Sequence, residues 1–403
     1  MSIKEELENL KIKELEIYRN LYKLGELNRI QLLETIGGSM TNLSRFLSDL
    51  EQLELIERFG AQGKKSGRKP GTYSIKKDAF YGIGGFIRVE SYGIGICNIG
   101  GDLIEFSGKI MEEKTTPDDI ASFFAEKTQF YQKKFEISKD KIVGIGIAAL
   151  GPVKKEKGII YKPYHMPTHW DIVPFKTILE MKTKFQVNVC SIAETILLEE
   201  LFFGSSKNKK STALFSLGRG IGSSVFSMGR IGIGNIDMNT SLGHIIVDFR
   251  GRTCYCGKKG CLETFGSIDR INEFLHDELG IDLEGIERPD DWKRTFHYSY
   301  SLDILKKELN LKNNKMEEFI SDLKEAYKAA MINYLSITRA EHLILCGRLV
   351  EYFPKMLEDI VGQILQNEDT GNDISLEFIR VTPEKLITGG SLIAFNNLIG
   401  FID

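Results

Sequence analysis

The sequence lacks the features that mark membrane, secreted and heavily basic proteins. No apolar run approaches the roughly 18 residues that span a bilayer. Residues 1–20 are charged throughout and lack the apolar core of a signal peptide. We therefore expect a cytoplasmic protein with no membrane partner. The net charge of −3 excludes a chain coated in positive charge but leaves room for a local basic patch. Proline is sparse, at 9 of 403 residues, and 42% of residues are hydrophobic, as in a globular chain of roughly two or three domains.

Cysteine is also scarce, but it is unevenly placed. Three of the six cysteines, Cys254, Cys256 and Cys261, fall within eight residues. In a reducing compartment such clustering favours a metal site over disulfide bonds. Together with His244 these thiols form a four-ligand set that favours tetrahedral zinc, with no position left for water, so we expect a structural site. The alternative is a loop of free, buried cysteines.

The first eighty residues have the pattern of a helix-turn-helix. Apolar side chains at helical spacing predict helices over 3–23, 29–36 and 41–53, and two glycines separate the last two. The third helix leaves small or hydrogen-bonding side chains outward near its N-terminus, where a recognition helix meets base edges. We therefore expect contacts with a double-stranded DNA operator from Thr41, Asn42, Ser44 and Arg45. The alternative is a solvated helical bundle in which Arg45 pairs with Asp49.

A basic hairpin is expected to follow this helix. Residues 55–59 and 72–75 have strand-like patterns, and no Asp or Glu occurs from Arg58 to Lys77. A glycine-rich loop with unopposed positive charge suits phosphate contact or insertion into a groove. The sequence therefore predicts a winged helix-turn-helix domain over 1–78, with DNA contacts from Lys64, Lys65, Arg68 and Lys69. The alternative for this segment is a flexible basic linker.

Residues 79–403 alternate strands and helices, which is typical of an α/β fold. Strands are expected at 81–88, 92–99, 103–109, 141–149, 186–190, 212–217, 222–228 and 342–347, and helices at 117–136, 174–184, 193–203 and 316–340. Glycine-rich hairpins open at 81–101 and again at 213–235, as two duplicated lobes would show.

The zinc-motif segment resembles that of the ROK family, which contains repressors, sugar kinases and uncharacterised reading frames. The match rests on Gly243-His244 followed by C-x-C-G-x-x-G-C. Further stretches resemble the turns of the family, namely 150–152, 163–170, 217–222 and 389–392, and SGRKP resembles its repressor branch. The resemblance implies two actin-like ATPase lobes behind a winged helix, with lobe one over 79–192, lobe two over 193–388 and a closing helix over 389–403. It also implies a homodimer or higher homo-oligomer.

The sequence departs from the kinases of this family at the residues that carry their chemistry. Their Asp-x-Gly-Gly-Thr phosphate turn is matched by 82–86, where the acid is Gly82 and the hydroxyl residue is Phe86. Their catalytic Asp is matched by Ile192, and their sugar-binding Glu by Ser241. Phosphoryl transfer needs a carboxylate near the hydroxyl and groups that hold metal-bound phosphates. We therefore expect no kinase activity. The alternative is an active, ATP-dependent sugar kinase in which Glu194 is the base.

The same losses leave the effector open. Possible contacts to a sugar or sugar derivative are His165, Trp170, Glu194 and the second ring nitrogen of His244. Trp170 is as well suited to core packing as to stacking on a sugar. The other alternative is that the pocket binds no ligand and that a protein partner regulates the chain. The sequence thus predicts a DNA-binding regulator, a repressor of sugar-metabolism genes, with a zinc-stabilised, inactive kinase-like domain for effector binding and dimerisation.

Overall fold

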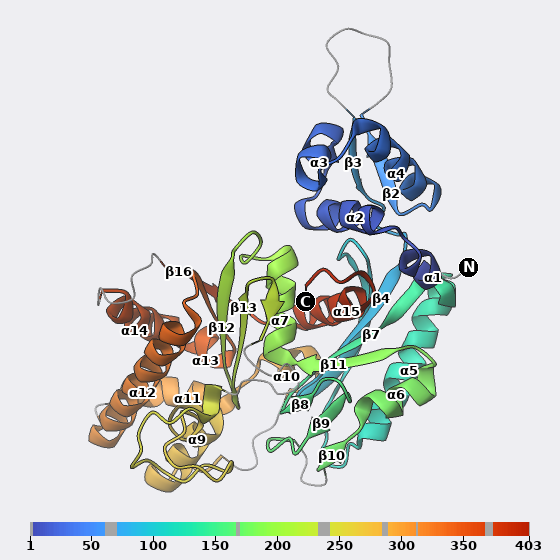
Figure 1. Ribbon diagram of the computed structural model, residues 1–403. Helices are drawn as coiled ribbons and strands as arrows, with labels where there is room; N and C mark the ends of the chain where they lie inside the picture. The colour runs from blue at the N-terminus through green and yellow to red at the C-terminus, as the bar shows by residue number, and fades with distance from the viewer. Residues whose placement is uncertain are drawn as a thin grey trace.

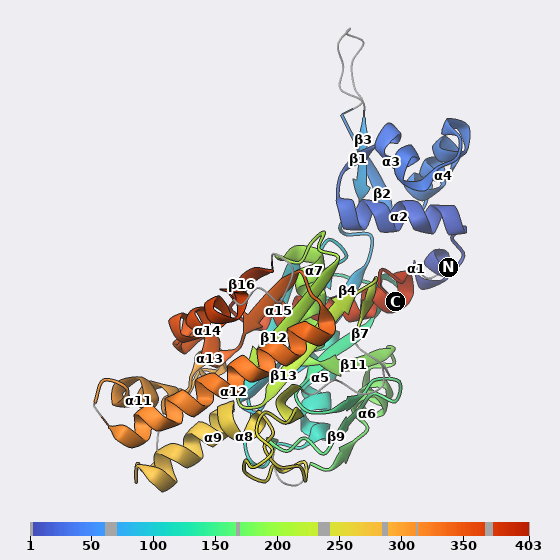
Figure 2. The same cartoon turned by 60° about the vertical axis from the view of Figure 1, so that its left-hand side comes forward.

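A small head lies above two α/β lobes in the computed structural model of the chain (Figures 1 and 2). The structure describes residues 3–60, 71–166, 170–232, 242–283, 289–311, 313–366 and 374–402. No helix in these ranges is both long and apolar enough to cross a membrane.

The described head contains three helices and a three-stranded antiparallel sheet of order β1-β3-β2. Its helices are α2 (Ile12–Leu24), α3 (Arg29–Ile36) and α4 (Met40–Gln52), and its strands are β1 (Leu27–Asn28), β2 (Ile56–Phe59) and β3 (Thr72–Ile75). The first helix, α1 (Ile3–Glu8), lies below the head against lobe one. The prediction of one helix over 3–23 was wrong. The chain starts a new helix after Lys11, because the Glu14 carboxylate accepts hydrogen bonds from both the backbone N–H (2.9 Å) and the side chain (2.8 Å) of Lys11.

Lobe one is built on a five-stranded mixed sheet of order β11-β7-β4-β5-β6. Its strands are β4 (Tyr81–Ile87), β5 (Ser91–Asn98), β6 (Leu103–Ile110), β7 (Ile142–Ala149) and β11 (Val187–Ser191). Helices α5 (Pro117–Lys134) and α6 (Phe175–Thr183) pack together beside this sheet, while α15 (Pro383–Ile399) packs on β4 and β7 and against α7 (Ile192–Phe203). A small sheet follows β7, with β8 (Val153–Lys154), β9 (Ile159–Tyr161) and β10 (Ile172–Val173).

Helix α15 is the closing helix, and it differs from the expectation of 389–403. It begins at Pro383, since the Thr382 side chain caps it by accepting the N–H of Lys385, and it ends before Gly400, whose φ is +64°. The glycines of β4 and β7 let α15 lie directly on the sheet: a Cβ added to Gly84 would stand 1.7 Å from the carbonyl oxygen of Ile387. Small residues at this contact therefore fix the position of the helix.

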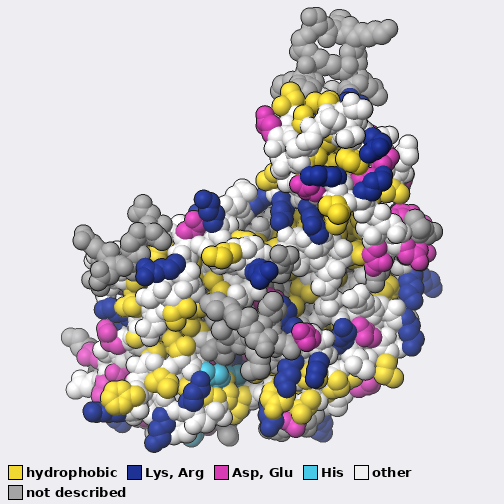
Figure 3. Space-filling view, viewed as in Figure 1, with side chains coloured by type: hydrophobic (Ala, Val, Ile, Leu, Met, Phe, Trp, Pro, Cys, Tyr) yellow, Lys and Arg dark blue, Asp and Glu magenta, His cyan; other side chains and the backbone are white. Residues whose placement is uncertain are grey.

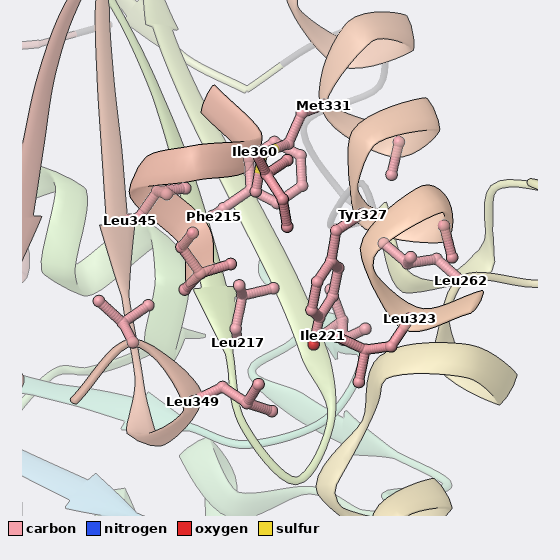
Figure 4. Packing of buried hydrophobic residues seen from close by; sticks show 14 of the residues in the cluster. Phe215, Leu217, Ile221, Leu262, Leu323, Tyr327, Met331, Leu345, Leu349 and Ile360 are labelled. Carbon is pink, nitrogen blue, oxygen red and sulfur yellow. The ribbon is translucent and has the colours of Figure 1, made fainter. Parts of the chain in front are cut away.

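Lobe two repeats the plan with a sheet of order β14-β13-β12-β15-β16. Its strands are β12 (Ser211–Leu217), β13 (Ile221–Ser227), β14 (Arg230–Ile231), β15 (His342–Cys346) and β16 (Ser375–Ile379). Its helices are α8 (Glu263–Gly266), α9 (Ile268–Glu273), α11 (Tyr300–Glu308), α12 (Asn314–Thr338), α13 (Arg348–Tyr352) and α14 (Pro354–Gln366). Between α9 and α11, helix α10 (Trp292–His297) packs on β5 and β6 of lobe one. Figure 4 shows Phe215 and Leu217 of β12 facing Tyr327 and Met331 of α12 across the core of this lobe.

The head shares a hydrophobic core with lobe one. The ring of Tyr22 on α2 stacks on Phe401, with centroids 4.1 Å apart, and meets Phe202 at the end of α7 edge-on at 5.3 Å. The side chain of Arg19 donates to the carbonyl of Ile399 at 2.6 Å. The head is therefore anchored to the end of α7 and to the segment after α15.

Candidate functional site

Helix α4 has the two faces expected of a recognition helix. Its apolar stripe is buried in the head, and the Ser39 side chain caps its N-terminus by accepting the N–H of Asn42 at 3.3 Å. The side chains expected to contact DNA lie outward: Thr41, Asn42 and Arg45 are exposed, and Ser44 is half-buried.

The alternative pairing of Arg45 with Asp49 is not formed in the described part of the chain. Asp49 accepts instead from Lys11 of the preceding helix at 3.1 Å, while the Arg45 guanidinium lies 5.1 Å from the ring centroid of Phe46. The visible face of the head carries both basic and acidic side chains (Figure 3). Helix α4 therefore presents a polar face at the surface of the described head, on which Arg45 is not paired with Asp49.

The strands of the expected wing are confirmed. Strands β2 and β3 pair antiparallel, with Phe59 opposite Thr72. The four basic residues predicted to contact DNA, Lys64, Lys65, Arg68 and Lys69, lie outside the described residues.

The four predicted zinc ligands come together. The ligand atoms of His244, Cys254, Cys256 and Cys261 all lie within 4.8 Å of one another. The Nδ1 atom of His244 is 3.5 Å from the Sγ of Cys254, and the Sγ atoms of Cys256 and Cys261 are 3.6 Å apart. Tetrahedral zinc with bonds of about 2.0–2.3 Å places its ligand atoms about 3.5–3.8 Å apart. The donor set and its spacing therefore fit zinc.

The backbone of this segment is folded back on itself to bring the thiols together. Isolated bridges pair Ile246 with Cys261 and Thr253 with Lys259. Gly260 has a φ of +72°, and a Cβ there would stand 1.5 Å from the carbonyl oxygen of Asp248. Only glycine fits this reversal, which returns Cys261 to the other ligands.

A cavity of about 140 Å³ lies between the lobes beside the predicted zinc ligands. It is lined by the ends of β7 and β11, the segment between β9 and β10, the start of α7, the β12–β13 hairpin, the predicted metal-binding segment and the start of α8. The lining residues are Ala149, Leu150, Gly151, Pro152, His165, Ser191, Ile192, Ala193, Ser216, Gly220, Ile221, Gly222, Ser223, His244, Tyr255 and Glu263. The cavity therefore meets the metal-binding segment through His244 and Tyr255.

Two buried side chains that line this cavity form an ion pair. Nε2 of His165 and Oε1 of Glu263 stand 3.3 Å apart in side chains that are 8% and 5% exposed. Nδ1 of His165 lies 2.7 Å from the carboxylate of Asp269, and Oε2 of Glu263 accepts the N–H of Ile221 at 3.0 Å. The imidazole of His165 is therefore held between two carboxylates at the wall of the cavity.

The charge on His165 is set by its two acidic neighbours. Burial by itself would lower the pKa of the imidazole, but the hydrogen bond to Asp269 and the nearby Glu263 outweigh it and raise the pKa to about 9. His165 is therefore a cation at neutral pH, with both ring nitrogens donating. The wall of the cavity thus carries a buried ion pair, in which Nε2 of His165 faces Oε1 of Glu263.

Two of the predicted ligand contacts lie elsewhere. Trp170 is buried in the core of lobe one, where its indole N–H donates to the carbonyl of Thr115 at 3.1 Å, and it does not line the cavity. The carboxylate of Glu194 forms an ion pair with Lys155 and is also absent from the lining. Sequence reasoning missed Glu263, although it stands two residues after the last zinc ligand, in the same C-L-E stretch.

A second buried cluster joins the lobes around Glu90, in the turn between β4 and β5. Its carboxylate lies 3.0 Å from Arg348, 3.6 Å from Arg219 and 3.9 Å from Arg88. Arg219 comes from the turn between β12 and β13, and Arg348 from the start of α13, so one carboxylate of lobe one is bound by two arginines of lobe two. The Arg88 guanidinium lies 4.1 Å from the ring centroid of Phe296.

Electrostatics keep this cluster ionised. Burial of Glu90 would raise its pKa, but the guanidinium groups of Arg348, Arg88 and Arg219 outweigh that effect and lower the pKa to about 2. Burial and the neighbouring Arg348 in turn lower the pKa of Arg88 to about 10. The three arginines form a cage around Glu90, which we call the arginine cage, at the β4–β5 and β12–β13 turns. Residues 82–86, which the resemblance matched to a phosphate turn, lie inside strand β4 instead.

Comparison with known proteins places this fold in a family. The ROK family matches residues 93–398. The chain belongs to the ROK family. The solved structure of a ROK family transcriptional regulator, a homologue of the Escherichia coli MLC protein, superposes with a TM-score of 0.75 at 18% identity and covers 97% of each chain. The ROK hexokinase of Thermus thermophilus superposes with a TM-score of 0.64 at 19% identity, and covers 79% of this chain and 99% of its own. At these identities the likeness is one of fold, and the regulator's fold includes the head.

The curated relatives include named sugar repressors. The xylose repressor of Bacillus spizizenii is 24% identical over 257 residues, which are 62% of this chain and 64% of the relative. The regulator NagC of Escherichia coli strain K12 is 26% identical over 268 residues, 64% of this chain and 63% of NagC. This chain thus spans less than two thirds of the length of either relative. The glucokinase of Thermotoga maritima is 29% identical over 204 residues, 48% of this chain and 64% of the glucokinase.

Proposed function

We propose that this chain is a DNA-binding transcriptional repressor of sugar-metabolism genes. Its ROK domain binds a sugar effector, holds a structural zinc ion, forms the dimer and has no kinase activity. The observation that carries the proposal is the exposed polar face of α4 on a head that shares its core with a ROK domain. The names of the repressor relatives point to sugar genes as the targets.

DNA recognition is assigned to the head. The exposed Thr41, Asn42 and Arg45 on α4 suit base edges in the major groove, and the basic wing residues Lys64 to Lys69 suit phosphates. A dimer would read two half-sites of a palindromic operator. This assignment predicts sequence-specific binding by the full chain.

The sugar effector is assigned to the cavity between the lobes. Sugar hydroxyls both donate and accept hydrogen bonds, which suits the charged His165–Glu263 pair in the wall of this cavity. The second ring nitrogen of His244, another residue of the lining, is a further contact. Trp170 and Glu194 have no part in this assignment, because the first is packed in the core and the second is paired with Lys155.

Zinc would be held by His244 and the three cysteines, and bound zinc supplies folding free energy to the segment that carries them. Two residues of this segment also reach the effector site. His244 and Tyr255 line the cavity, and Tyr255 stacks on Tyr164 with ring centroids 3.9 Å apart. The role of the site is therefore to set the shape of one wall of the cavity.

The absence of kinase activity rests on the chemistry of the cavity. Ile192 lines it where a base would be needed, and Glu194, the alternative base, is bound to Lys155. The guanidinium groups of the arginine cage are already paired with Glu90, so they are not free to bind phosphates. Incubation with ATP, magnesium and a panel of hexoses should release no sugar phosphate above background. If the wild-type protein phosphorylates a hexose and Glu194→Gln abolishes this activity, the chain is a sugar kinase instead.

Selection of DNA ligands by the full chain tests the proposed function. The protein should enrich one palindromic sequence from a random pool, and gel shifts should show at least about 10³-fold tighter binding to it than to random DNA at physiological salt. A sugar that binds the cavity should release the operator. Equal affinity for the selected and the random DNA would contradict the proposed repressor function.

A further inference from the structure

Two arginines of the head are held against one buried tyrosine. The guanidinium carbons of Arg29, the first residue of α3, and of Arg58, on β2, each lie 5.7 Å from the ring centroid of Tyr73, on β3. Tyr73 is fully buried, whereas Arg29 is half-buried and Arg58 is exposed. The tyrosine therefore joins two cationic groups that come from different elements of the head.

Strand pairing and one side-chain contact fix the position of both arginines. Arg58 is directly opposite Tyr73 in the antiparallel β2–β3 ladder, so the two side chains leave the same face of the sheet. Nε and Nη2 of Arg29 donate to the hydroxyl of Tyr73 at 3.0 and 2.9 Å. Each guanidinium group also gains a cation–π contact with the ring. Because both side chains are already held in place, an anion that binds them costs little side-chain freedom.

The two positive charges have no acidic partner in the described part of the chain. The polar and cation–π contacts of both guanidinium groups there are those with Tyr73. Glu57, the neighbour of Arg58, lies on the opposite face of its strand, because successive side chains alternate. The carboxylate of Glu26 accepts a hydrogen bond from the hydroxyl of Thr72 instead. Two nearby cations without a counter-charge repel one another, so an anion bound beside them stabilises the arrangement.

This pair of arginines lies on the side of the head that the proposed function turns to DNA. Helix α3 directly precedes α4, and β2 directly precedes the basic residues expected in the wing. The β2–β3 ribbon projects away from the lobes in both views of the molecule (Figures 1 and 2). The planar guanidinium group of arginine matches the oxygens of a phosphate, and it stacks on aromatic rings while it does so.

We propose that Arg29 and Arg58 bind phosphate groups of the DNA backbone and that Tyr73 is the positioning residue that holds them. The proposal rests on the proposed function, in which the head binds DNA. It adds a phosphate site outside both α4 and the basic loop, and phosphate contacts of this kind fix the register of a protein on the duplex without reading its sequence.

Gel shifts of the full chain at several salt concentrations, on the selected operator and on random DNA, test the proposal. Arg29→Gln and Arg58→Gln should each weaken binding to both DNAs on the order of 10-fold. Each should also lower the slope of log affinity against log salt concentration by about one. Arg380→Gln is the matched control, because it removes the same charge from a side chain of lobe two that is 62% exposed, and it should change neither quantity.

Two further experiments connect the effect to phosphates and to Tyr73. Operators that carry a single neutral methylphosphonate linkage, placed at each position in turn, should include a linkage at which the wild type loses affinity and Arg58→Gln does not. Tyr73→Phe keeps the ring but removes the hydroxyl that holds Arg29. Its loss of affinity should not add to that of Arg29→Gln but should add to that of Arg58→Gln, a pattern that a general loss of stability does not produce.

The outcomes separate this inference from the function on which it rests. If both arginine variants keep the affinity and the salt slope of the wild type, the phosphate site is excluded while DNA binding by the head stands. A loss confined to the operator would mean a base contact and would equally overturn the phosphate site. If the wild type binds neither DNA, the DNA-binding function fails and the inference with it. If Arg29→Gln does not fold, the exposed Arg58 and the neutral linkages decide.

Discussion

Replacing Glu90 by glutamine should strongly destabilise this protein. Glu90→Gln keeps the shape of the side chain but leaves Arg88, Arg219 and Arg348 around a neutral group. Removing one partner of a buried ion pair typically costs about 3–5 kcal/mol, because the other charges stay buried without compensation. The fall of the Glu90 pKa from 4.5 to about 2 independently corresponds to about 3 kcal/mol at neutral pH. Both routes therefore give a loss near 3 kcal/mol.

Urea denaturation at pH 7 measures the loss as a free energy of unfolding. Glu16→Gln is the matched control: it removes the same charge from a pair with Lys13 whose N–O distance is 2.7 Å and whose side chains are 37% and 47% exposed. Exposed pairs of this kind contribute about 0–1 kcal/mol. A Glu90→Gln protein that is as stable as the control would refute the claim that the arginine cage holds the lobes together.

The pH dependence of the same loss has a definite sign. The pKa of Glu90 is lower in the folded protein than its ordinary value of 4.5, so its contribution to stability is fully present above pH 4.5 and is lost as the pH falls towards 2. The difference between the wild type and Glu90→Gln should be constant from pH 8 to 5 and should narrow below pH 4.5. A difference that grows on acidification would contradict the assignment of the charge.

The head, the metal site and their coupling give three further tests. Cys256→Ser should bind less zinc by elemental analysis and lose on the order of 3 kcal/mol of unfolding free energy, and full stability without metal would exclude a structural role. Arg45→Ala should lose about 1–3 kcal/mol of operator affinity and relax the sequence preference at one base position. Lys64→Ala should instead weaken binding to all DNA sequences and lower the slope of log affinity against log salt concentration by about one. If Arg45→Ala binds the operator in gel shifts as tightly as the wild type, Arg45 does not contact a base. Phe202→Ala removes the contact between α7 and Tyr22 of the head. If α7 connects the effector cavity to the head, this variant should keep its affinity for the sugar but release the operator less when the sugar binds. Unchanged release would exclude α7 as that connection.

Several features follow from local sequence alone. The zinc ligands could be named because three cysteines and two glycines within eight residues leave the backbone few ways to fold, and the structure brings all four ligand atoms together. The helix at 29–36 and the strand at 72–75 were predicted at their observed bounds. In each case the determinants, apolar spacing, caps and turns, lie within a few residues of the element.

Other features depend on where distant segments meet. Glu90 and Arg348 are 258 residues apart in the chain, and His165 and Asp269 are 104 apart, so no local pattern marks either pair. From the sequence, Trp170 and Glu194 could both contact a sugar. In the structure, Trp170 is packed in the core beside Thr115, and Glu194 forms an ion pair with Lys155. Spacing and propensity act over one or two turns of chain, whereas a cavity forms only where two packed lobes leave charged and apolar groups facing one another. Local sequence therefore determined the four candidate metal ligands and the amphipathic helix α4, and the tertiary structure decided which side chains line the cavity between the lobes.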